Sequence, residues 1–242
     1  SLIKRERGES TNVPNYVDES GYTKDISART KVGDMDITAE LALYNIAKDT
    51  VFIIDVSGLP GIEQLPDYTS DYPDKEWKEE TREVIPANIH FSEKGEKAVV
   101  NLRSKDNKDR WIALIDLEKG TLKSIEHQRD EAWLAGPGIG YTYYGFEELG
   151  WLPDNKHIYF QSEETGYSHL YLLNVENGRK KALTSGEYEV FDPSISNDEK
   201  HWYFTSSEVH PGERHFYKMP LMGGKMEQLT SMTGNKDVAL SP

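Results

Sequence analysis

The most constraining feature of the sequence is a repeat in its C-terminal half. The run His-Ile-Tyr-Phe at 157–160 recurs as His-Trp-Tyr-Phe at 201–204, and His-Leu-Tyr at 169–171 recurs as His-Phe-Tyr at 215–217. The offsets are 44 and 46 residues (201 − 157 and 215 − 169). Aromatic and β-branched runs between polar turns favour strands, and a repeat of this length is typical of one β-propeller blade. The repeat therefore predicts an all-β fold of antiparallel four-stranded sheets.

Earlier parts of the chain contain weaker copies of the same unit. Strand-like runs at 41–46, 51–56 and 111–117 precede the clearer run at 170–175. Together these units predict about four consecutive blades, of which the first are irregular. We therefore expect residues 1–242 to form one section of a β-propeller domain, ending at a blade boundary.

Two segments interrupt the pattern, and one turn within it has a distinctive sequence. Residues 57–86 are rich in proline and predict an insertion between strands, with one short helix over 74–83. Residues 128–150 form a second interruption, rich in glycine and tyrosine. Asn177-Gly178 predicts a type I′ hairpin turn, in which both central residues take positive φ.

Composition excludes several classes of protein. The formal net charge is −14, which disfavours nucleic acid as a partner because such binding depends on neutralising phosphates with Lys and Arg. Cysteine is absent, which excludes disulfides, cysteine nucleophiles and cysteine metal sites. No apolar stretch approaches the length of a membrane span. We expect no cofactor.

The sequence also lacks the usual signs of a complete catalytic or metal site. Gly-x-Ser-x-Gly, which marks the nucleophile of α/β-hydrolases, does not occur, and neither does His-Glu-x-x-His. Histidines repeat at blade spacing, which favours a structural role over a ligand role. The adjacent pairs Glu79-Glu80, Glu147-Glu148 and Glu163-Glu164 should point to opposite faces of a strand, so we interpret them as solvated strand ends. We therefore predict no catalytic residue and no metal ligand in this chain.

One loop is a candidate for ligand binding. The run 132–144 contains Gly136, Gly138 and Gly140, which permit close approach, followed by three tyrosines. Tyr141, Tyr143 and Tyr144 could line a pocket with their hydroxyl groups available. The alternative is a tight connection between blades in which the tyrosines pack. Both interpretations stay open at this stage.

Several of these segments resemble a known family. Val-Pro-Asn-Tyr at 13–16, Arg-Thr-Lys-Val-Gly at 29–33, the 133–144 loop and the Gly-Tyr-x-His-Leu-Tyr run within 164–171 look like the propeller of dipeptidyl peptidase IV-type enzymes. These enzymes belong to the prolyl oligopeptidase family of serine peptidases. The resemblance is strongest over 152–184 and covers nearly the whole chain.

The resemblance implies how a complete protein would work. Such enzymes have an N-terminal eight-bladed propeller, and a C-terminal α/β-hydrolase domain carries the Ser, Asp and His triad. The propeller restricts access to the active site and helps to hold the peptide, and the tyrosines at 141, 143 and 144 correspond roughly to one of its pocket loops. The family's propeller glutamate pair and the arginine of that loop have no evident match here. That leaves exopeptidase specificity unsupported by this sequence.

The resemblance leads to a set of expectations. The chain should be a non-catalytic part of a peptidase that removes short units from peptide N-termini. Its partners would be the peptide substrate and a hydrolase domain in cis, and its location would be the bacterial periplasm or the exterior. An excised propeller section should also self-associate through exposed blade faces. The alternatives are a free-standing propeller that binds protein or glycan, and a propeller glycosidase.

Overall fold

The structure, a computed structural model, describes residues 2–6, 9–31, 38–140 and 147–240. Almost all of its regular structure is β. The strands are β1 (Leu2–Glu6), β2 (Thr11–Asn15), β3 (Lys24–Ala28), β4 (Thr38–Asn45), β5 (Thr50–Ile53), β6 (Val84–Phe91), β7 (Ala98–Ser104), β8 (Asp109–Asp116), β9 (Thr121–Arg129), β10 (Leu149–Trp151), β11 (His157–Ser162), β12 (His169–Asn174), β13 (Lys180–Ala182), β14 (Val190–Ile195), β15 (His201–Ser206), β16 (His215–Pro220) and β17 (Glu227–Gln228). Two 3-10 turns, η1 (Ile46–Lys48) and η2 (Asp67–Asp71), complete the elements.

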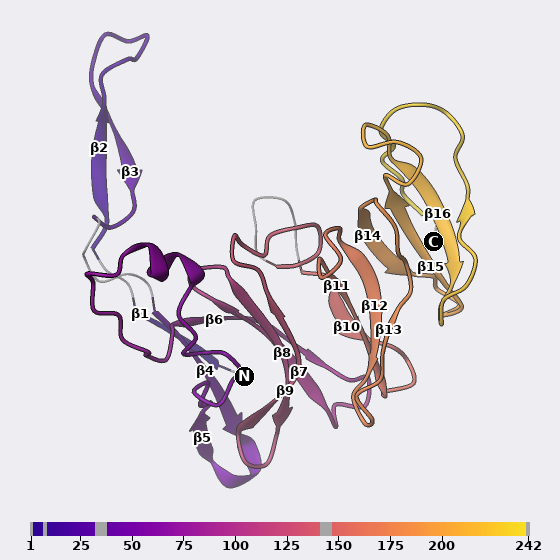
Figure 1. Cartoon of the computed structure of the whole chain (residues 1–242), viewed down its shortest axis with the longest axis horizontal. Coiled ribbons are helices and arrows are strands. Elements are labelled where there is room, and N and C mark those ends of the chain that lie inside the picture. The colour runs from indigo at the N-terminus through magenta and orange to yellow at the C-terminus, as the bar shows by residue number, and fades with distance from the viewer. Residues whose placement is uncertain (1, 7–8, 32–37, 141–146, 241–242) are drawn as a thin grey trace.

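The strands form sheets of the size and order that the repeat predicts. β6 to β9, β10 to β13 and β14 to β17 are three four-stranded antiparallel meanders, each in chain order, and they follow one another as successive blades (Figure 1). The repeated histidines occupy equivalent places, because His157 and His201 begin the second strand of their sheets. A three-stranded sheet, β1-β4-β5, precedes them. The prediction of antiparallel propeller blades is confirmed.

The core lies between neighbouring sheets. One cluster, which includes Leu43, Ile54 and Trp111, joins the β1-β4-β5 sheet to the β6–β9 sheet. Similar clusters join each later pair of sheets, with Phe160 and Trp202 among their fully buried members. Each blade therefore gains stability chiefly by covering the apolar face of the next, as in other repeat architectures.

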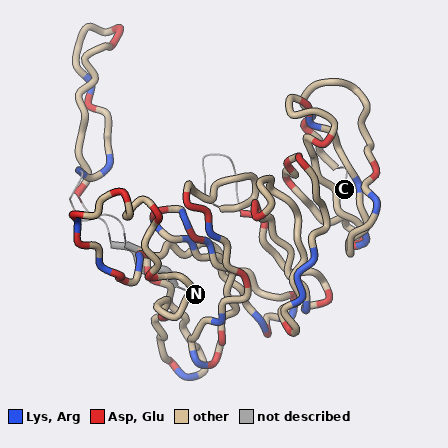
Figure 2. Tube along the Cα trace, viewed as in Figure 1, with Lys and Arg blue, Asp and Glu red and all other residues tan. Residues whose placement is uncertain are grey.

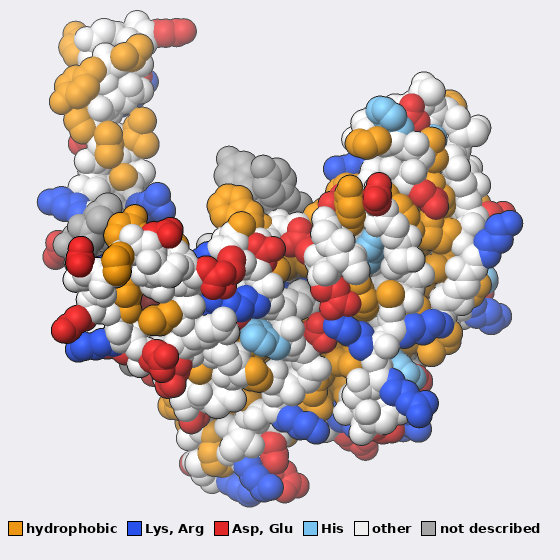
Figure 3. All heavy atoms as spheres, viewed as in Figure 1, with side chains coloured by type: hydrophobic (Ala, Val, Ile, Leu, Met, Phe, Trp, Pro, Cys, Tyr) orange, Lys and Arg blue, Asp and Glu red, His pale blue; other side chains and the backbone are white. Residues whose placement is uncertain are grey.

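A hairpin of β2 and β3 stands away from the sheets (Figure 1). Hydrophobic side chains are visible along it in the space-filling view (Figure 3), and Tyr16, Val17 and Tyr22 are each more than three-quarters exposed. Elsewhere, acidic and basic residues are interspersed along the surface loops (Figure 2). In the described part of the chain, no helix has the length and apolar character needed to cross a membrane.

The short helix predicted over 74–83 is wrong. Between η2, which ends at Asp71, and β6, which begins at Val84, the chain contains no helix or strand. An isolated helix of ten residues is marginal in water, and tertiary contacts hold this segment in another conformation. The Arg82 guanidinium donates to the Gly61 carbonyl (2.8 Å) and to Asp109 Oδ2 (2.6 Å), while Trp77 packs edge-on against Tyr68.

The type I′ turn predicted at Asn177-Gly178 is also wrong. Gly178 has φ +73°, but Asn177 does not have a positive φ. Instead, the Asn174 side chain accepts hydrogen bonds from the backbone N–H groups of Glu176 (3.0 Å) and Asn177 (3.2 Å). Asp116 makes the same contacts before Gly120, with its Oδ1 3.0 Å from the nitrogens of Glu118 and Lys119. The β6–β9 and β10–β13 sheets therefore share a turn that a side chain caps, whereas the turn after Pro220 in the third sheet closes with a hydrogen bond from Gly223 to the Pro220 carbonyl.

Candidate functional site: an acidic pocket between two blades

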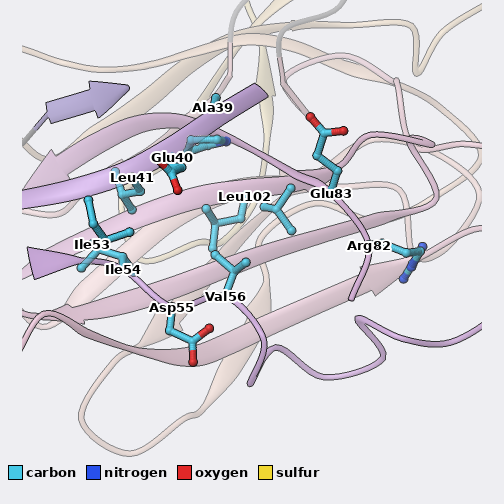
Figure 4. Close-up of a pocket in the computed structure, with 12 residues that line it drawn as sticks. Ala39, Glu40, Leu41, Ile53, Ile54, Asp55, Val56, Arg82, Glu83 and Leu102 are labelled. Carbon is cyan, nitrogen blue, oxygen red and sulfur yellow. The ribbon is translucent and has the colours of Figure 1, made fainter. Parts of the chain in front are cut away.

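Two pockets of the molecule could bind a ligand, to judge from their position or from the residues that line them. The first, of about 450 Å³, lies between the β1-β4-β5 sheet and the start of β6 (Figure 4). Apolar side chains such as Leu41 and Leu102 form its middle, between the carboxylates of Glu83 and Asp55 (Figure 4). Leu41 and Leu102 are also members of the core cluster between these sheets, so this pocket is a crevice in the packing.

The second pocket, of about 430 Å³, has a different chemistry. It lies between the β10–β13 and β14–β17 sheets, beside the loop that joins β9 to β10. Its lining residues are Trp133, Ala135, Gly136, Pro137, Gly138, Glu148, Glu163, Phe191, Asp192 and Arg214. We call this the acidic pocket. Charged groups converge on it from four separate segments, which makes it the stronger candidate.

Main-chain and side-chain hydrogen bonds hold the 133–138 wall of the acidic pocket. The Ala135 N–H donates to Glu163 Oε2 (3.2 Å), and the Ser168 hydroxyl donates to the Pro137 carbonyl (2.7 Å). A Cβ atom built on Gly136 would lie 2.0 Å from Glu163 Oε1, and one on Gly138, where φ is +69°, would lie 2.0 Å from Gln161 Oε1. These two glycines therefore permit the close approach that the sequence predicts, toward side chains of the next blade.

Glu148 is the most perturbed acid of the pocket. Burial, followed by the nearby carboxylates of Asp192 and Glu147, raises the pKa of Glu148 from its ordinary 4.5 to about 7. Asp192 lies at a bulge of β14, where the register with β15 shifts, and takes a left-handed conformation with φ +49°. The bulge turns this strand locally, as bulges beside binding sites commonly do.

One cation faces these acids. The Arg214 guanidinium lies 3.7 Å from the centre of the Phe191 ring, in a cation–π contact. Among the residues that the structure describes, no ion pair joins Arg214 to Glu148, Glu163 or Asp192 within 4 Å. Three carboxylates and one guanidinium thus give the pocket a surplus of negative charge.

The adjacent pair Glu147-Glu148 points in two directions, as predicted, but the interpretation of this pair as a solvated strand end is wrong. Glu147 is buried, and its Oε1 lies 3.3 Å from Nε2 of His90 in β6. Glu148 lines the acidic pocket on the other side. The preceding blade therefore buries Glu147, whereas Glu148 is half-buried at the pocket on the side of the following blade.

The histidines of the repeat have structural contacts, in accordance with their predicted role. His169 is fully buried, and its ring nitrogens lie 3.0 Å from Thr184 Oγ1 and 3.0 Å from the Gly186 carbonyl. In the β14–β17 sheet, His215 contacts Glu213 Oε2 (2.9 Å), in the loop before β16, and the Thr230 carbonyl (2.9 Å), in the segment after β17. In the described ranges, no group of three or more His, Asp and Glu side chains could hold a metal ion.

The tyrosines predicted to bind substrate, Tyr141, Tyr143 and Tyr144, lie outside the described residues. The described residues on either side are Gly140 and Glu147. Glu148, Asp192 and Arg214 were not predicted as site residues. Glu148 is separated from Asp192 by 44 positions, close to the blade repeat, and only the packing of successive blades brings the two together.

Comparison with known proteins identifies the family. The model of the family described as "Dipeptidyl peptidase IV (DPP IV) N-terminal region" matches residues 6–242. The chain belongs to this family. It is therefore a propeller section of a dipeptidyl peptidase IV-like protein, as the resemblance implied.

Individual relatives agree with this assignment. A probable dipeptidyl-aminopeptidase B of Aspergillus oryzae is 28% identical over 220 residues, which cover 87% of this chain and 22% of the relative. A probable dipeptidyl peptidase 4 of Aspergillus clavatus is 25% identical over 215 residues, covering 86% of this chain and 25% of the relative. The chain thus spans about a quarter or less of the length of these curated relatives.

Solved structures show the same fold. The dipeptidyl peptidase 4 of Porphyromonas gingivalis superposes with a TM-score of 0.65 at 18% identity, over 99% of this chain and 30% of that chain. A putative dipeptidyl aminopeptidase IV of Bacteroides ovatus gives a TM-score of 0.61 at 14% identity, over 93% of this chain and 30% of that chain.

Proposed function

We propose that this chain is the non-catalytic propeller portion of a serine exopeptidase that removes short units from peptide N-termini. In this proposal a C-terminal α/β-hydrolase domain of the same protein carries the nucleophile, the base and the oxyanion hole. The propeller section restricts access to that domain and contacts the peptide. The family match over residues 6–242 is the observation that carries the proposal.

The acidic pocket supports a binding role for this section. Its lining combines a few converging polar groups with aromatic surface, and its volume of about 430 Å³ falls in the range of small-molecule and peptide side-chain sites. It lies beside the loop that contains Tyr141, Tyr143 and Tyr144, which we propose as further contacts to the peptide.

Location outside the cytoplasm stays a prediction, which cell fractionation would test.

The test compares the full-length protein with the chain alone. The full-length protein should release the chromophore from Gly-Pro and Ala-Pro substrates and should react with a serine-directed fluorophosphonate. The 242-residue chain should do neither, because binding loops without a nucleophile and oxyanion hole do not cleave an amide. A full-length protein without a hydrolase domain, or one that binds but never cleaves peptides, would favour the alternative of a propeller binding module.

A further inference from the structure

An unpaired acceptor lies directly behind Gly138, one of the residues that line the acidic pocket. The Gln161 side chain is fully buried, and its Nε2 donates to Ser168 Oγ (3.1 Å) and to the Val190 carbonyl (2.8 Å). These two bonds fix the orientation of the amide, and they leave Oε1 without a hydrogen-bond partner. That oxygen lies against Gly138, a lining residue, at the point where Cγ of Glu148 also approaches. Buried acceptors of this kind are rare because an unmade hydrogen bond is costly.

The charges around this oxygen favour a cation. Glu148, Glu163 and Asp192 line the pocket with one guanidinium, and a cation there would relieve the repulsion between Glu148 and Asp192. In the described residues no group of acids is arranged to hold a metal ion, so the cation that we consider here is an organic one. The aromatic groups fit as well: Phe191 already contacts a guanidinium, and Trp133, 68% exposed, presents a second ring at the pocket.

We propose that the acidic pocket binds a basic side chain, Lys or Arg, of the peptide that the propeller holds. This inference rests on the proposed peptidase function and names a substrate class for it. Carboxylates of Glu148 and Asp192 receive the ammonium or guanidinium group, and the aromatic rings cover its aliphatic stem. The enzyme would then prefer peptides with a basic residue at the position that reaches this pocket.

A peptide offers two organic cations, its basic side chains and its amino terminus, so the probes must separate them. The first probe is acetyl-Ala-Lys-Ala-amide, in which only the side chain is charged. The second is acetyl-Ala-Gln-Ala-amide, which carries no charge. The third is Ala-Gln-Ala-amide with a free amino terminus. Calorimetry and tryptophan fluorescence of the 242-residue chain, in which Trp133 lies at the pocket, measure binding at pH 8.

The Lys peptide should bind at least tenfold more tightly than either Gln peptide. Asp192→Asn and Glu148→Gln should each remove most of that difference, while Glu118→Gln, on an exposed turn of another blade, should preserve it. Asn tolerates the left-handed backbone of Asp192, so the first variant keeps the bulge. Circular dichroism and thermal melting of each variant confirm that it folds.

Three results would overturn the inference: equal binding of all three peptides, tightest binding of the peptide with a free amino terminus, or a Lys preference that both variants retain. Activity of the full-length protein is scored separately. Cleavage of Gly-Pro substrates without any basic preference would leave the peptidase function intact and refute the pocket's role. Lys-specific binding by a protein that cleaves no peptide would refute the peptidase function and keep the pocket's role.

Discussion

Replacing Glu148 by Gln should stabilise the folded chain, and the gain should be clearly larger at pH 8 than at pH 5. The pKa of Glu148 is raised from 4.5 to about 7, first by burial and then by Asp192 and Glu147. Between these values the folded state keeps a proton that the unfolded state releases, so the wild-type chain loses stability as the pH rises from about 4.5 to about 7. Gln cannot ionise, so the variant avoids this loss.

The size of the effect follows from the pKa. Each pKa unit corresponds to about 1.4 kcal/mol, so a rise from 4.5 to about 7 makes ionised Glu148 cost about 3 kcal/mol of folding free energy. The gain for Glu148→Gln should therefore be about 3 kcal/mol at pH 8 and about 1 kcal/mol at pH 5. The charged groups that face Glu148 in the pocket are Asp192, Glu163 and Arg214. Tyr159 of β11 packs beside Glu148, and its pKa is raised by burial and then by Glu148.

Urea unfolding followed by tryptophan fluorescence at the two pH values measures this difference. Glu118→Gln is the matched control, since its exposed side chain should leave stability unchanged at both pH values. A gain of equal size at pH 5 and pH 8 would mean that lost charge repulsion is not the cause. A loss of stability at pH 8 would mean that the carboxylate is stabilised in the fold, and our account of the pocket's electrostatics would be refuted.

Three further predictions concern stability and association. Asp109→Ala should destabilise the chain by about 3–5 kcal/mol in urea unfolding, because it removes the buried carboxylate that pairs with Arg82 (2.6 Å), Arg129 (2.7 Å) and His127 (2.7 Å). Unchanged stability would show that the network is dispensable. Gly178→Ala should lower the free energy of unfolding by about 1 kcal/mol through its positive φ alone. Gly120→Ala, at the equivalent turn, should lower it clearly more, because the new Cβ would also lie 2.5 Å from Cβ of Phe52. Equal melting temperatures for the two variants would contradict this. Self-association should strengthen with added salt, because salt screens the repulsion between copies of a chain with net charge −14. Light scattering measures this association. A monomer at every salt level would refute the prediction.

The repeat made the fold predictable where each blade follows the common pattern. His169 and His215 recur because each begins the third strand of its sheet and reaches across to the connection that follows the sheet's last strand. Strands β2 and β3 carry few apolar residues that alternate, so no local sequence pattern predicts this hairpin. The irregular conformation of 74–83 depends on contacts such as that of Arg82 with Asp109, which no local pattern contains.

The candidate site was predictable only in part. The glycine-rich loop was singled out correctly as a place of close approach, since Gly136 and Gly138 contact side chains of the next blade. Asp192 could not be found in this way, because the bulge that places it at the pocket depends on its pairing with β15. The perturbed pKa of Glu148 likewise arises from burial between two blades, which spacing along the chain does not reveal.

The hairpin of β2 and β3 interrupts a strand pair without separating it. Glu6, at the end of β1, pairs with Thr38, at the start of β4, so the chain leaves this sheet and returns to it at neighbouring positions. The entropic cost of closing a loop grows only with the logarithm of its length. Shortening or lengthening the segment between β1 and β4 should therefore change the stability of this sheet only slightly. The register between β1 and β4 therefore does not depend on the length of the segment between them. In the laboratory, the same position is a natural place to insert a reporter peptide or a short connecting turn.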